Sequence, residues 1–370
     1  MSFAPHRLVT TVDVAVVGGG PAGSTCARAL VAAGLEVAVL DQARFPRDKV
    51  CAGWITPEVV EQLQLDLDEY ARAGVLAPFT AFRVGLVGRP PVLVDYGRPV
   101  SYGIRREEFD DYLLRRSGAV VAPPVRVTRV ERAGGWWRIE HDWRAKVLVG
   151  AGGHRCPVAR ALNPAAAREP AVVAQRAERR CAVPALAPGI PELYFSDDLH
   201  GYGWLVPKGP WVNVGFGRDE PAHLPAHVGR FAEGLVRAGR LDASTARGWQ
   251  GHAYLVAATS PRRVVGDHVL LAGDAAGLAS AGSGEGIYAA VRSGRLAAEA
   301  VRRLLLARDP LSLADYAGRL AADLGLGRPA RAAAGWLPAP WRTAAAGACF
   351  RSRAFVRHVL NGTFLHGLQL

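Results

Sequence analysis

The chain has 370 residues, of which 50% are hydrophobic and 21% charged, which excludes a disulfide-stabilised mini-domain and a disordered tail. Its net charge of +12 comes mainly from arginine, and it favours acidic ligands, phosphates or anionic membranes without choosing among them. The five cysteines are scattered, odd in number and never spaced as CxxC, which argues against a disulfide framework or a zinc module.

The N-terminal residues and the apolar runs bear on the compartment. Residues 1–10 lack the apolar core of a signal peptide, and no later run reaches the uncharged apolar length that a spanning helix requires. We therefore expect a cytoplasmic protein. Basic residues interleaved with aromatics, as nucleic-acid binding would need, are not evident, so we expect no nucleic-acid partner.

The N-terminal segment has the pattern of a βαβ unit. A β-branched run at 12–17 ends in a glycine-rich stretch, a helix-like segment follows at 24–33, and a second strand at 36–40 ends at Asp41. Such a unit predicts a parallel sheet with a helix packed on it.

The glycine-rich stretch matches the dinucleotide-binding pattern GxGxxG with Gly18, Gly20 and Gly23. These glycines permit a tight turn, close approach of the backbone to a pyrophosphate, and close packing of helix on strand. The anion would lie at the helix N-terminus, where free N–H groups and the helix dipole favour negative charge. Asp41 is placed to accept hydrogen bonds from both hydroxyls of an adenosine ribose. The pattern favours a dinucleotide site over a structural glycine turn, without separating NAD from FAD.

The middle of the chain reads as antiparallel strands. Residues 194–216 alternate aromatics and glycines around a turn at 208–210. One face of these strands could present Tyr202 and Trp204 to an apolar substrate, and the alternative is that the rings belong to the core of a sheet.

Metal ligands are only weakly indicated. His223 and His227 have the i,i+4 spacing of a zinc pair, but Pro225 between them argues against an intact helix, and no Glu completes HExxH. We expect no metal site.

A second glycine-rich segment follows another buried-strand pattern at 269–272. It begins with Gly273 and Asp274, and a stretch at 282–286 then enters a long Ala-rich helix at Ile287. An Asp at a strand end can bind a polyol hydroxyl, and the glycines let a helix N-terminus approach a flat ring. An NAD site would not require this segment. The alternative is a helix cap with packing glycines.

The C-terminal residues 301–370 are rich in Ala and Arg, with aromatics among them. Such a segment is usually a terminal helical cap with a solvated basic face. A second interpretation is a peripheral contact with an anionic membrane, because basic and aromatic residues suit the interface.

Five segments together resemble the flavoprotein monooxygenase superfamily. They are VVGGGPAG at 16–23, Asp41, IRREEFD at 104–110, VLVGAGG at 147–153 and LLAGDAAG at 270–277. The resemblance implies that the first glycine loop binds the FAD pyrophosphate, that the acid after the second strand binds the adenosine ribose, that the later Asp binds ribitol, and that an Arg contacts the cofactor. The FAD-binding residues so implied are Gly18, Gly20, Pro21, Ala22, Gly23, Asp41, Gln42, Arg106, Gly152, Gly273, Asp274, Gly284, Gly286 and Ile287.

Within that superfamily the chain looks most like the geranylgeranyl reductase branch. FPRDKVCAG at 45–53 resembles its KxCGG loop, which lies near the flavin ring, with Ala52 in place of a Gly. YGWLVPK at 202–208, with two later glycines, resembles its YxWxFPK…GxG motif, except that Leu-Val replaces the usual residue-Phe pair. The resemblance makes Cys51, Tyr202 and Trp204 the candidate catalytic residues.

On chemistry alone, Cys51 shares its loop with Lys49 and Arg47, and positive charge favours the thiolate. The alternative is an inert buried cysteine, since free cysteines are usually buried.

The electron donor is less clear from the sequence. Where the superfamily usually reads GADG, this chain has Gly152 in place of the acid, which weakens the case for an NADPH-dependent hydroxylase. A second GxGxxG is absent, so a dedicated nicotinamide domain is not expected. NADPH or NADH is the expected reductant.

We predict an α/β fold with a Rossmann-like FAD-binding domain of the GR2 type, an inserted antiparallel β-sheet substrate domain, and C-terminal helices. The predicted ranges are 1–77, 101–165 and 262–308 for the FAD-binding domain, 78–100 and 166–261 for the substrate domain, and 309–370 for the helical region.

The predicted function is an FAD-dependent reductase that delivers hydride from flavin N5 to a C=C bond of an isoprenoid-like or other apolar substrate. The main alternative is a flavin monooxygenase that uses O₂ to hydroxylate a phenol, quinone or lipid. A third class is a flavin-bound partner protein without catalysis.

Overall fold

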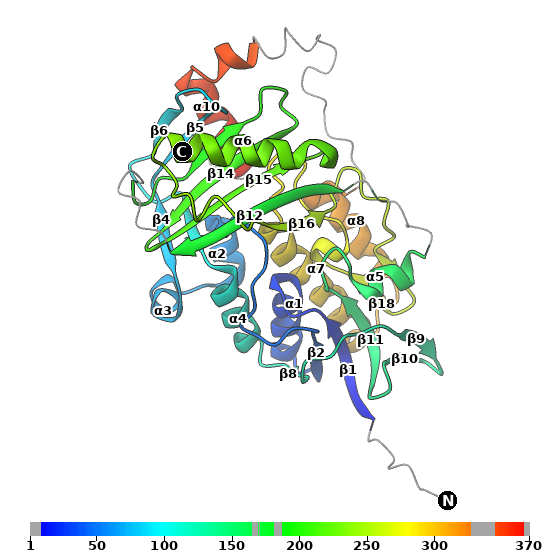
Figure 1. The fold of residues 1–370 in the computed structure, drawn as a ribbon. Coiled ribbons are helices and arrows are strands. Elements are labelled where there is room, and N and C mark those ends of the chain that lie inside the picture. Colours follow the sequence, from blue (N-terminus) through cyan, green and yellow to red (C-terminus); the bar gives the residue numbers. More distant parts are fainter. Residues whose placement is uncertain (1–8, 165–168, 170, 181–186, 327–344, 366–370) are drawn as a thin grey trace, which may run out of the picture.

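Two large sheets organise the computed structural model, which describes residues 9–164, 169, 171–180, 187–326 and 345–365 (Figure 1). Within these residues one sheet has eight strands, a second has seven, and a small third sheet has three. The two large sheets differ in strand direction, and this difference separates the molecule into two parts.

The eight-stranded sheet has a parallel core in the order β18–β11–β1–β2–β8. β17 pairs antiparallel with β18, and the hairpin of β9 and β10 extends β11. Parallel strands are buried on both faces, which explains why every residue of VAVL in β2 and VLL in β18 is buried. The strands are β1 (Thr10–Val17), β2 (Val37–Leu40), β8 (Val120–Val121), β9 (Val130–Ala133), β10 (Trp136–Ile139), β11 (Trp143–Gly150), β17 (Val265–Gly266) and β18 (Val269–Leu271).

Helices cover the faces of this sheet. α1 packs along α7, and α8 packs on α7 in turn. A Cβ at Gly294 of α7 would lie 2.4 Å from the carbonyl oxygen of Ala22, so glycine permits the close crossing of α7 over the start of α1. The helical elements are α1 (Pro21–Ala32), α4 (Arg106–Arg116), α5 (Pro157–Leu162), η2 (Gly273–Ala275), α7 (Ile287–Leu306) and α8 (Ser312–Leu324).

The seven-stranded sheet runs in the order β16–β12–β15–β14–β13–β5–β6, and its neighbours are antiparallel except for β13 and β5. Alternate residues face opposite sides, so Leu205 packs in the cluster beneath α6, whereas Trp204 and Val206 pack with the C-terminal helices. The elements are β5 (Ala81–Leu86), β6 (Val92–Asp95), β12 (Val172–Arg180), β13 (Glu192–Phe195), β14 (Gly201–Lys208), β15 (Trp211–Arg218), η1 (Pro221–His223), α6 (Leu224–Arg237) and β16 (Gln250–Tyr254).

A small antiparallel sheet, in the order β3–β7–β4, links the two parts, because β4 leads directly into β5 and β7 leads into α4. Its strands are β3 (Trp54–Ile55), β4 (Leu76–Phe79) and β7 (Ser101–Ile104), and the neighbouring helices are α2 (Pro57–Leu63) and α3 (Leu67–Ala73).

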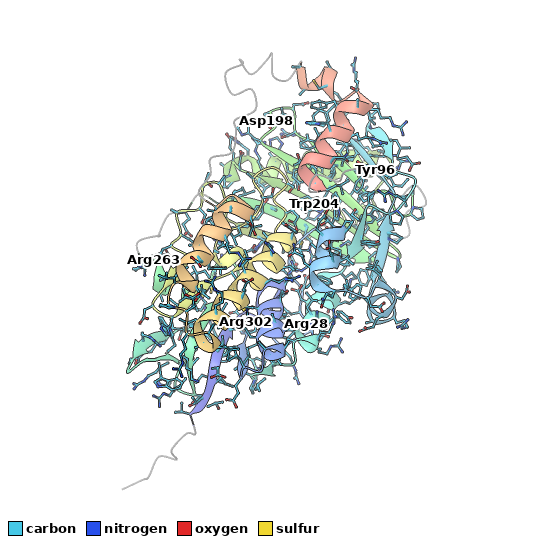
Figure 2. All side chains as sticks on the ribbon, turned by 180° about the vertical axis from the view of Figure 1, so that it is seen from behind. Arg28, Tyr96, Asp198, Trp204, Arg263 and Arg302 are labelled. Carbon is cyan, nitrogen blue, oxygen red and sulfur yellow. The ribbon has the colours of Figure 1, made fainter. Side chains whose placement is uncertain are left out.

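The C-terminal helices α10 (Arg353–Val359) and η3 (Leu360–Phe364) pack on the edge of the seven-stranded sheet. Tyr96 donates its hydroxyl to Asn361 Oδ1 at 2.8 Å, and the Arg357 guanidinium lies 5.0 Å from the centre of the Tyr96 ring. Figure 2 shows Tyr96 beside these helices. The chain end therefore closes over the face that carries Trp204.

The predicted α/β fold, with a Rossmann-like part, an antiparallel sheet and C-terminal helices, is confirmed. All strands of the seven-stranded sheet lie inside the ranges 78–100 and 166–261, although the domain boundaries themselves remain a prediction. The first helix begins at Pro21 rather than at residue 24, because proline at the first helical position has no N–H to leave unpaired.

Pro225 lies in the first turn of α6, which begins at Leu224, so His223 lies before this helix and His227 within it. As expected, no single helix spans the two histidines. Proline is tolerated there because the N–H that it lacks would have had no partner within the helix.

Candidate active site

The three glycines of the GxGxxG loop have different structural tasks. Gly18 has a left-handed φ of 112°, and a Cβ there would lie 2.3 Å from the carbonyl oxygen of Ala151. A Cβ at Gly23 would lie 1.9 Å from the carbonyl oxygen of Gly18. For a Cβ at Gly20, the nearest atom would be Arg47 Nη2, at 3.5 Å. The fold itself therefore requires Gly18 and Gly23, whereas Gly20 leaves room for a ligand.

The start of α1 fits the pyrophosphate of FAD. Gly20 is the N-cap and provides no side-chain hydrogen bond, and Pro21 and Ala22 are buried in the first turn. The N–H groups of this turn and the guanidinium of Arg47 offer positive charge to an anion. A ligand would therefore meet Gly20, the helix end and Arg47 together.

Asp41 stands at the end of β2, where the adenosine ribose of FAD is expected. Its Oδ2 accepts a hydrogen bond from the backbone N–H of Gly19 at 2.8 Å, and its Oδ1 accepts one from Ala43 at 2.9 Å. Gln42, also predicted to contact FAD, is exposed beside it. Asp41 thus joins the glycine loop to the end of β2, and the position of its carboxylate fits the predicted binding of the adenosine ribose.

Asp274 lies between two cationic or titratable side chains from other parts of the chain. Its Oδ2 is 3.7 Å from Lys49 Nζ and 3.6 Å from His252 Nε2, and these two nitrogens are 2.6 Å apart. Burial alone would raise the pKa of Asp274, but the hydrogen bond from His252 and the charge of Lys49 outweigh it and lower the pKa well below 3.8. Asp274 is therefore ionised at neutral pH, as a polyol-binding carboxylate should be.

Burial has the larger effect on Lys49. It lowers the pKa of this ammonium from 10.5, and the nearby Asp274 only partly opposes the shift. Lys49 belongs to the KxCGG-like loop and His252 to β16, so the contact joins the Cys51 loop, the seven-stranded sheet and the second glycine segment.

Side chains of the seven-stranded sheet hold the second glycine segment. Tyr202 donates its hydroxyl to the carbonyl oxygen of Ser283. Gly284 has a φ of 65°, and a Cβ there would lie 2.2 Å from the Tyr254 hydroxyl. A Cβ at Gly286 would lie 3.3 Å from Asp274 Oδ1. These contacts bring the predicted flavin segment against β14 and β16.

The remaining predicted residues of this region lie around the same segment. A Cβ at Gly273 would lie 3.0 Å from the Cβ of Ala22, so this glycine sits directly against the first turn of α1. Ile287 is buried at the start of α7. Gly152 borders Gly18, because a Cβ at Gly18 would lie 2.6 Å from the Gly152 nitrogen, and Gly152 itself packs against Cys156.

Arg106 forms a buried two-pronged ion pair. Its Nε and Nη2 donate to Asp110 Oδ1 and Oδ2, both at 2.7 Å, and Arg47 Nη1 lies 2.9 Å from Oδ2 of the same carboxylate. Burial alone would lower the pKa of Arg106, but the neighbouring Asp110 carboxylate and Cys51 side chain outweigh it and raise that pKa. The Cys51 sulfur further accepts the Gly53 N–H at 3.4 Å. Contact of Arg106 with FAD remains a prediction.

Trp204 and Tyr202 are neighbours on one face of β14, with ring centres 6.0 Å apart. Trp204 is only 6% exposed, whereas Tyr202 is partly exposed. The indole N–H of Trp204 donates to Asn213 Oδ1 at 2.8 Å. Figure 2 marks Trp204 within the sheet. The contact of Trp204 with a substrate remains a prediction.

An aromatic cluster lies next to Tyr202. The Trp54 ring stacks on Phe82 with centres 5.0 Å apart and on Phe364 with centres 5.8 Å apart. Phe364 also meets Tyr202 edge to face, at 5.4 Å. These rings come from β3, β5 and the chain end, so the wall beside the Cys51 loop is strongly apolar.

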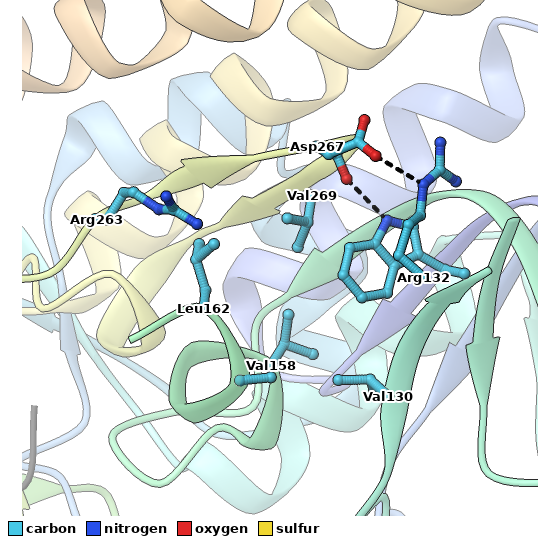
Figure 3. Close-up of a pocket in the computed structure, with 9 residues that line it drawn as sticks. Val130, Arg132, Val158, Leu162, Arg263, Asp267 and Val269 are labelled. Carbon is cyan, nitrogen blue, oxygen red and sulfur yellow. Dashed lines mark hydrogen bonds and ion pairs between the residues drawn. The ribbon is translucent and has the colours of Figure 1, made fainter. Parts of the chain in front are cut away.

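A cavity of about 230 Å³ lies elsewhere, between β9, β10, α5 and the start of β18 (Figure 3). Apolar side chains such as Val130, Val158 and Leu162 line it, and Arg132 pairs with Asp267 at 3.1 Å on its rim. None of the nine lining residues belongs to the predicted flavin site, so this cavity is not the candidate active site.

In the described part of the chain, no three metal-ligating side chains gather at one point. His223 precedes α6, and His227 stacks on Phe216 with ring centres 5.6 Å apart. In the same residues, every helix is too short or too polar to cross a bilayer.

Comparison with known proteins defines the class. Residues 13–84 match the family of FAD dependent oxidoreductases. Together with the glycine loop and the start of α1 described above, this match makes the protein an FAD-dependent oxidoreductase. The chain belongs to the geranylgeranyl reductase family. It is 31% identical over 343 residues to geranylgeranyl diphosphate reductase of Rhodobacter capsulatus, covering 81% of this chain and 78% of the relative.

Other similar proteins extend the comparison. Menaquinone reductase of Mycobacterium tuberculosis is 32% identical over 362 residues, which cover 84% of this chain and 81% of the relative. A geranylgeranyl bacteriochlorophyll reductase-like protein from Thermoplasma acidophilum has a similar structure, with a TM-score of 0.75 at 20% identity, over 97% of this chain and 98% of the other. PqsL of Pseudomonas aeruginosa, a probable FAD-dependent monooxygenase, has a TM-score of 0.67 at 20% identity, over 95% and 100% of the chains.

Several residues of the site were not singled out from the sequence. Trp54, His252 and Phe364 each come from a different element, and no local pattern marks any of them as part of a site. Arg47 was noticed only for its charge near Cys51. Arg47 lies in the same loop as the KxCGG-like motif, and this position is the sequence signal that could place Arg47 near the cofactor.

Proposed function

We propose that this protein uses reduced FAD to saturate C=C bonds of an isoprenoid-like or other apolar substrate. The observation that carries the proposal is that the Cys51 loop, the second glycine segment and the aromatic cluster around Trp54 meet at one place. A reductase needs a flavin-binding edge and an apolar wall next to each other. The names of the relatives in the family support the same reaction class.

The residues described above fit FAD, with the glycine loop and Arg47 toward the pyrophosphate, Asp41 toward the adenosine ribose and Asp274 toward the ribitol. When bound and reduced, FAD supplies a hydride at N5. The chain then has to exclude water, align the alkene and supply a proton to the carbon that does not receive the hydride. Trp54 is partly exposed and is backed by the buried rings of Phe82 and Phe364, so it offers the dry apolar surface that such a substrate requires.

We assign the proton to the pair of Lys49 and His252. The 2.6 Å separation of Lys49 Nζ and His252 Nε2 allows one proton to be shared or passed between them. The lowered pKa of Lys49 makes its proton easier to give up than that of an exposed lysine. The group regains its proton from solvent after each turnover. The thiol of Cys51 is the alternative proton donor in the same loop.

A stopped-flow experiment tests the reductase directly. The holoprotein is reduced by light without oxygen and mixed with geranylgeranyl diphosphate or a menaquinone with an unsaturated side chain, while the flavin absorbance is followed. We expect reoxidation of the flavin together with a product two mass units heavier per reduced bond. Reoxidation by O₂ alone, with a hydroxylated product, would replace the proposal with the monooxygenase. Absence of both reactions would leave a flavin-bound partner protein.

The electron donor is tested in the same apparatus. We propose NADPH or NADH, and the rates of flavin reduction by each are compared with that of dithionite. Reduction by dithionite alone would refute the proposal and indicate a separate protein donor.

Cys51→Ser and Lys49→Met separate the roles within the loop. Loss of alkene reduction in Lys49→Met, with flavin reduction unchanged, is expected if this ammonium supplies the proton. Unchanged rates in Cys51→Ser would make the thiol a bystander.

A further inference from the structure

A buried charged group lies behind the Cys51 loop. Lys208, at the end of β14, is fully buried, and its Nζ donates to Glu178 Oε1 and to the carbonyl oxygen of Ile104, both at 2.8 Å. Glu178 lies on β12, and its side chain is 7% exposed. Removing two charges from water costs more than their attraction usually returns, so stability alone does not explain this pair.

Asn213 connects the pair to the loop. Its amide nitrogen donates to Glu178 Oε1 at 3.0 Å and to the carbonyl oxygen of Cys51 at 2.9 Å. Its amide oxygen accepts the indole N–H of Trp204 at 2.8 Å. Because Trp204 can only donate and Glu178 accepts, the two contacts fix which way the amide points. Asn213 is therefore held with its N–H groups toward the Cys51 backbone.

Two further contacts restrain the same loop. Arg176 of β12 donates to the carbonyl oxygen of Lys49 at 3.1 Å and pairs with Asp48. Gly53 has a φ of 67°, and a Cβ there would lie 2.3 Å from Lys208 Nζ. The loop is thus tied on both sides of Cys51 to side chains of the seven-stranded sheet.

The same network gives a physical reason for the spacing of the motif that spans β14 and β15. A Cβ at Gly215 would lie 2.1 Å from the Trp204 ring, so the glycine opposite Trp204 makes room for the indole. The indole in turn holds Asn213. The motif residues Trp204, Lys208 and Gly215 therefore belong to one packed unit.

We propose that Lys208, Glu178 and Asn213 form a buried clamp that holds the backbone of Cys51 and so sets the position of its thiol beside Arg106. These are positioning residues, and Trp204 acts with them by orienting Asn213. The role of the thiol in turnover rests on the function proposed above, but its position does not, and it can be measured without turnover.

Asn213→Leu tests the clamp, because leucine keeps the branched shape of the side chain and removes both N–H groups. The holoprotein is treated with iodoacetamide, and the modification of each cysteine peptide is followed by mass spectrometry, with Cys349 as the internal reference. We expect the alkylation rate of Cys51 relative to Cys349 to rise about tenfold or more, with FAD still bound. An unchanged ratio would overturn the proposal.

Arg218→Met is the matched control. Arg218 lies on the same strand as Asn213 and is equally shielded, but it pairs with Asp198 and Glu220, away from the loop. Its ratio should equal that of the wild type, and a rise equal to that of Asn213→Leu would overturn the proposal by showing general loosening of the sheet. If Asn213→Leu does not fold, Asn213→Ser is used, whose hydroxyl is too short to hold the Cys51 carbonyl. If the wild-type protein does not reduce an alkene but Asn213→Leu still raises the alkylation ratio, the proposed reductase function is refuted and the clamp is retained.

Discussion

At the scale of single residues, space and charge distinguish residues that the fold needs from those that a ligand needs. Gly18 and Gly23 are enforced by backbone atoms at 2.3 Å and 1.9 Å from a hypothetical Cβ, whereas the nearest atom to a Cβ at Gly20 is a flexible arginine end at 3.5 Å. Asp274 keeps its charge because Lys49 and His252 compensate its burial. A residue can therefore belong to a motif for the sake of the fold or for the sake of the cofactor.

Gly20→Val should lose FAD and keep its fold. The backbone at Gly20 has a φ of −74°, which valine can adopt, but the new methyl groups would occupy the space next to the N-terminus of α1. We expect the ratio of flavin to protein absorbance to fall close to zero and the circular dichroism of the apoprotein to match that of wild-type apoprotein. Stoichiometric yellow flavin in the purified variant would refute the placement of the pyrophosphate.

At the scale of elements, the crossing of α1 and α7 places the two glycine segments next to each other. Gly294 allows α7 to touch the first turn of α1, and Gly273 lies against Ala22 in the same turn. A single helix pair thus holds together segments that are more than 250 residues apart in the chain. Packing between the helices, rather than the segments themselves, sets their distance.

Gly294→Ala should be destabilising, since its Cβ would lie 2.4 Å from the carbonyl oxygen of Ala22. We expect a loss of about 1–3 kcal/mol in the free energy of unfolding, as for an overpacked core, together with weaker FAD binding. The matched control is Gly318→Ala in the middle of α8, where no atom lies within 4 Å of the new Cβ. There the gain in helix propensity should stabilise by about 0.5–1 kcal/mol. Chemical denaturation of both variants gives the comparison, and equal effects would contradict the close crossing.

At the scale of the whole molecule, the two large sheets meet through polar contacts around the Cys51 loop. Lys49 reaches His252, Asn213 reaches the Cys51 carbonyl, and Tyr202 reaches Ser283. The ionic partners in this region make the junction sensitive to pH. The C-terminal helices add an apolar cover on the side of Trp54.

The buried carboxylates of Glu178 and Asp274 should lose their contribution to stability only below about pH 4.5. Burial raises the pKa of Glu178, but Lys208 and Asn213 lower it below 4.5 overall, and the pKa of Asp274 is lowered below 3.8. A carboxylate with a lowered folded pKa contributes stability above its unfolded pKa and loses it as pH falls through the folded value. The free energy of unfolding should therefore be flat with respect to these groups from pH 7 to 5 and fall below 4.5. Glu178→Gln should lower the free energy of unfolding at neutral pH and make it fall less steeply below pH 4.5, as measured by urea unfolding at each pH.

The predicted membrane contact is tested with vesicles. Arg351 and Arg353 are exposed near the start of α10. Within the predicted basic segment 301–370, residues 327–344 and 366–370 lie outside the described residues. If this end contacts an anionic surface, the double variant Arg351→Glu and Arg353→Glu should sediment less with phosphatidylglycerol vesicles, and added salt should weaken binding. Arg115→Glu on α4 is the control with an exposed arginine elsewhere. Equal sedimentation of all three proteins would refute the contact.

Much of the fold could be predicted because its signals are local. The strand–glycine–helix pattern around Gly18 and the aromatic strands on either side of the turn after Lys208 appear where they were expected. A proline in the first turn and one in the middle of a helix look alike in a short window, so the sequence does not reveal that Pro225 lies in the first turn of α6. Trp204 shows a further limit, since the sequence does not reveal that its indole N–H is bound by the buried Asn213.

The sequence by itself determined the class of protein, the glycine loop before α1 and the two kinds of sheet. Each of these depends on neighbours within a few residues, through backbone turns, strand alternation and helix capping. Only the tertiary structure decided which side chains complete the site, because Arg47, His252, Asn213 and Phe364 meet there through pairing of distant strands and packing of the chain end. Such contacts depend on distance in space, which a local pattern of residues does not encode.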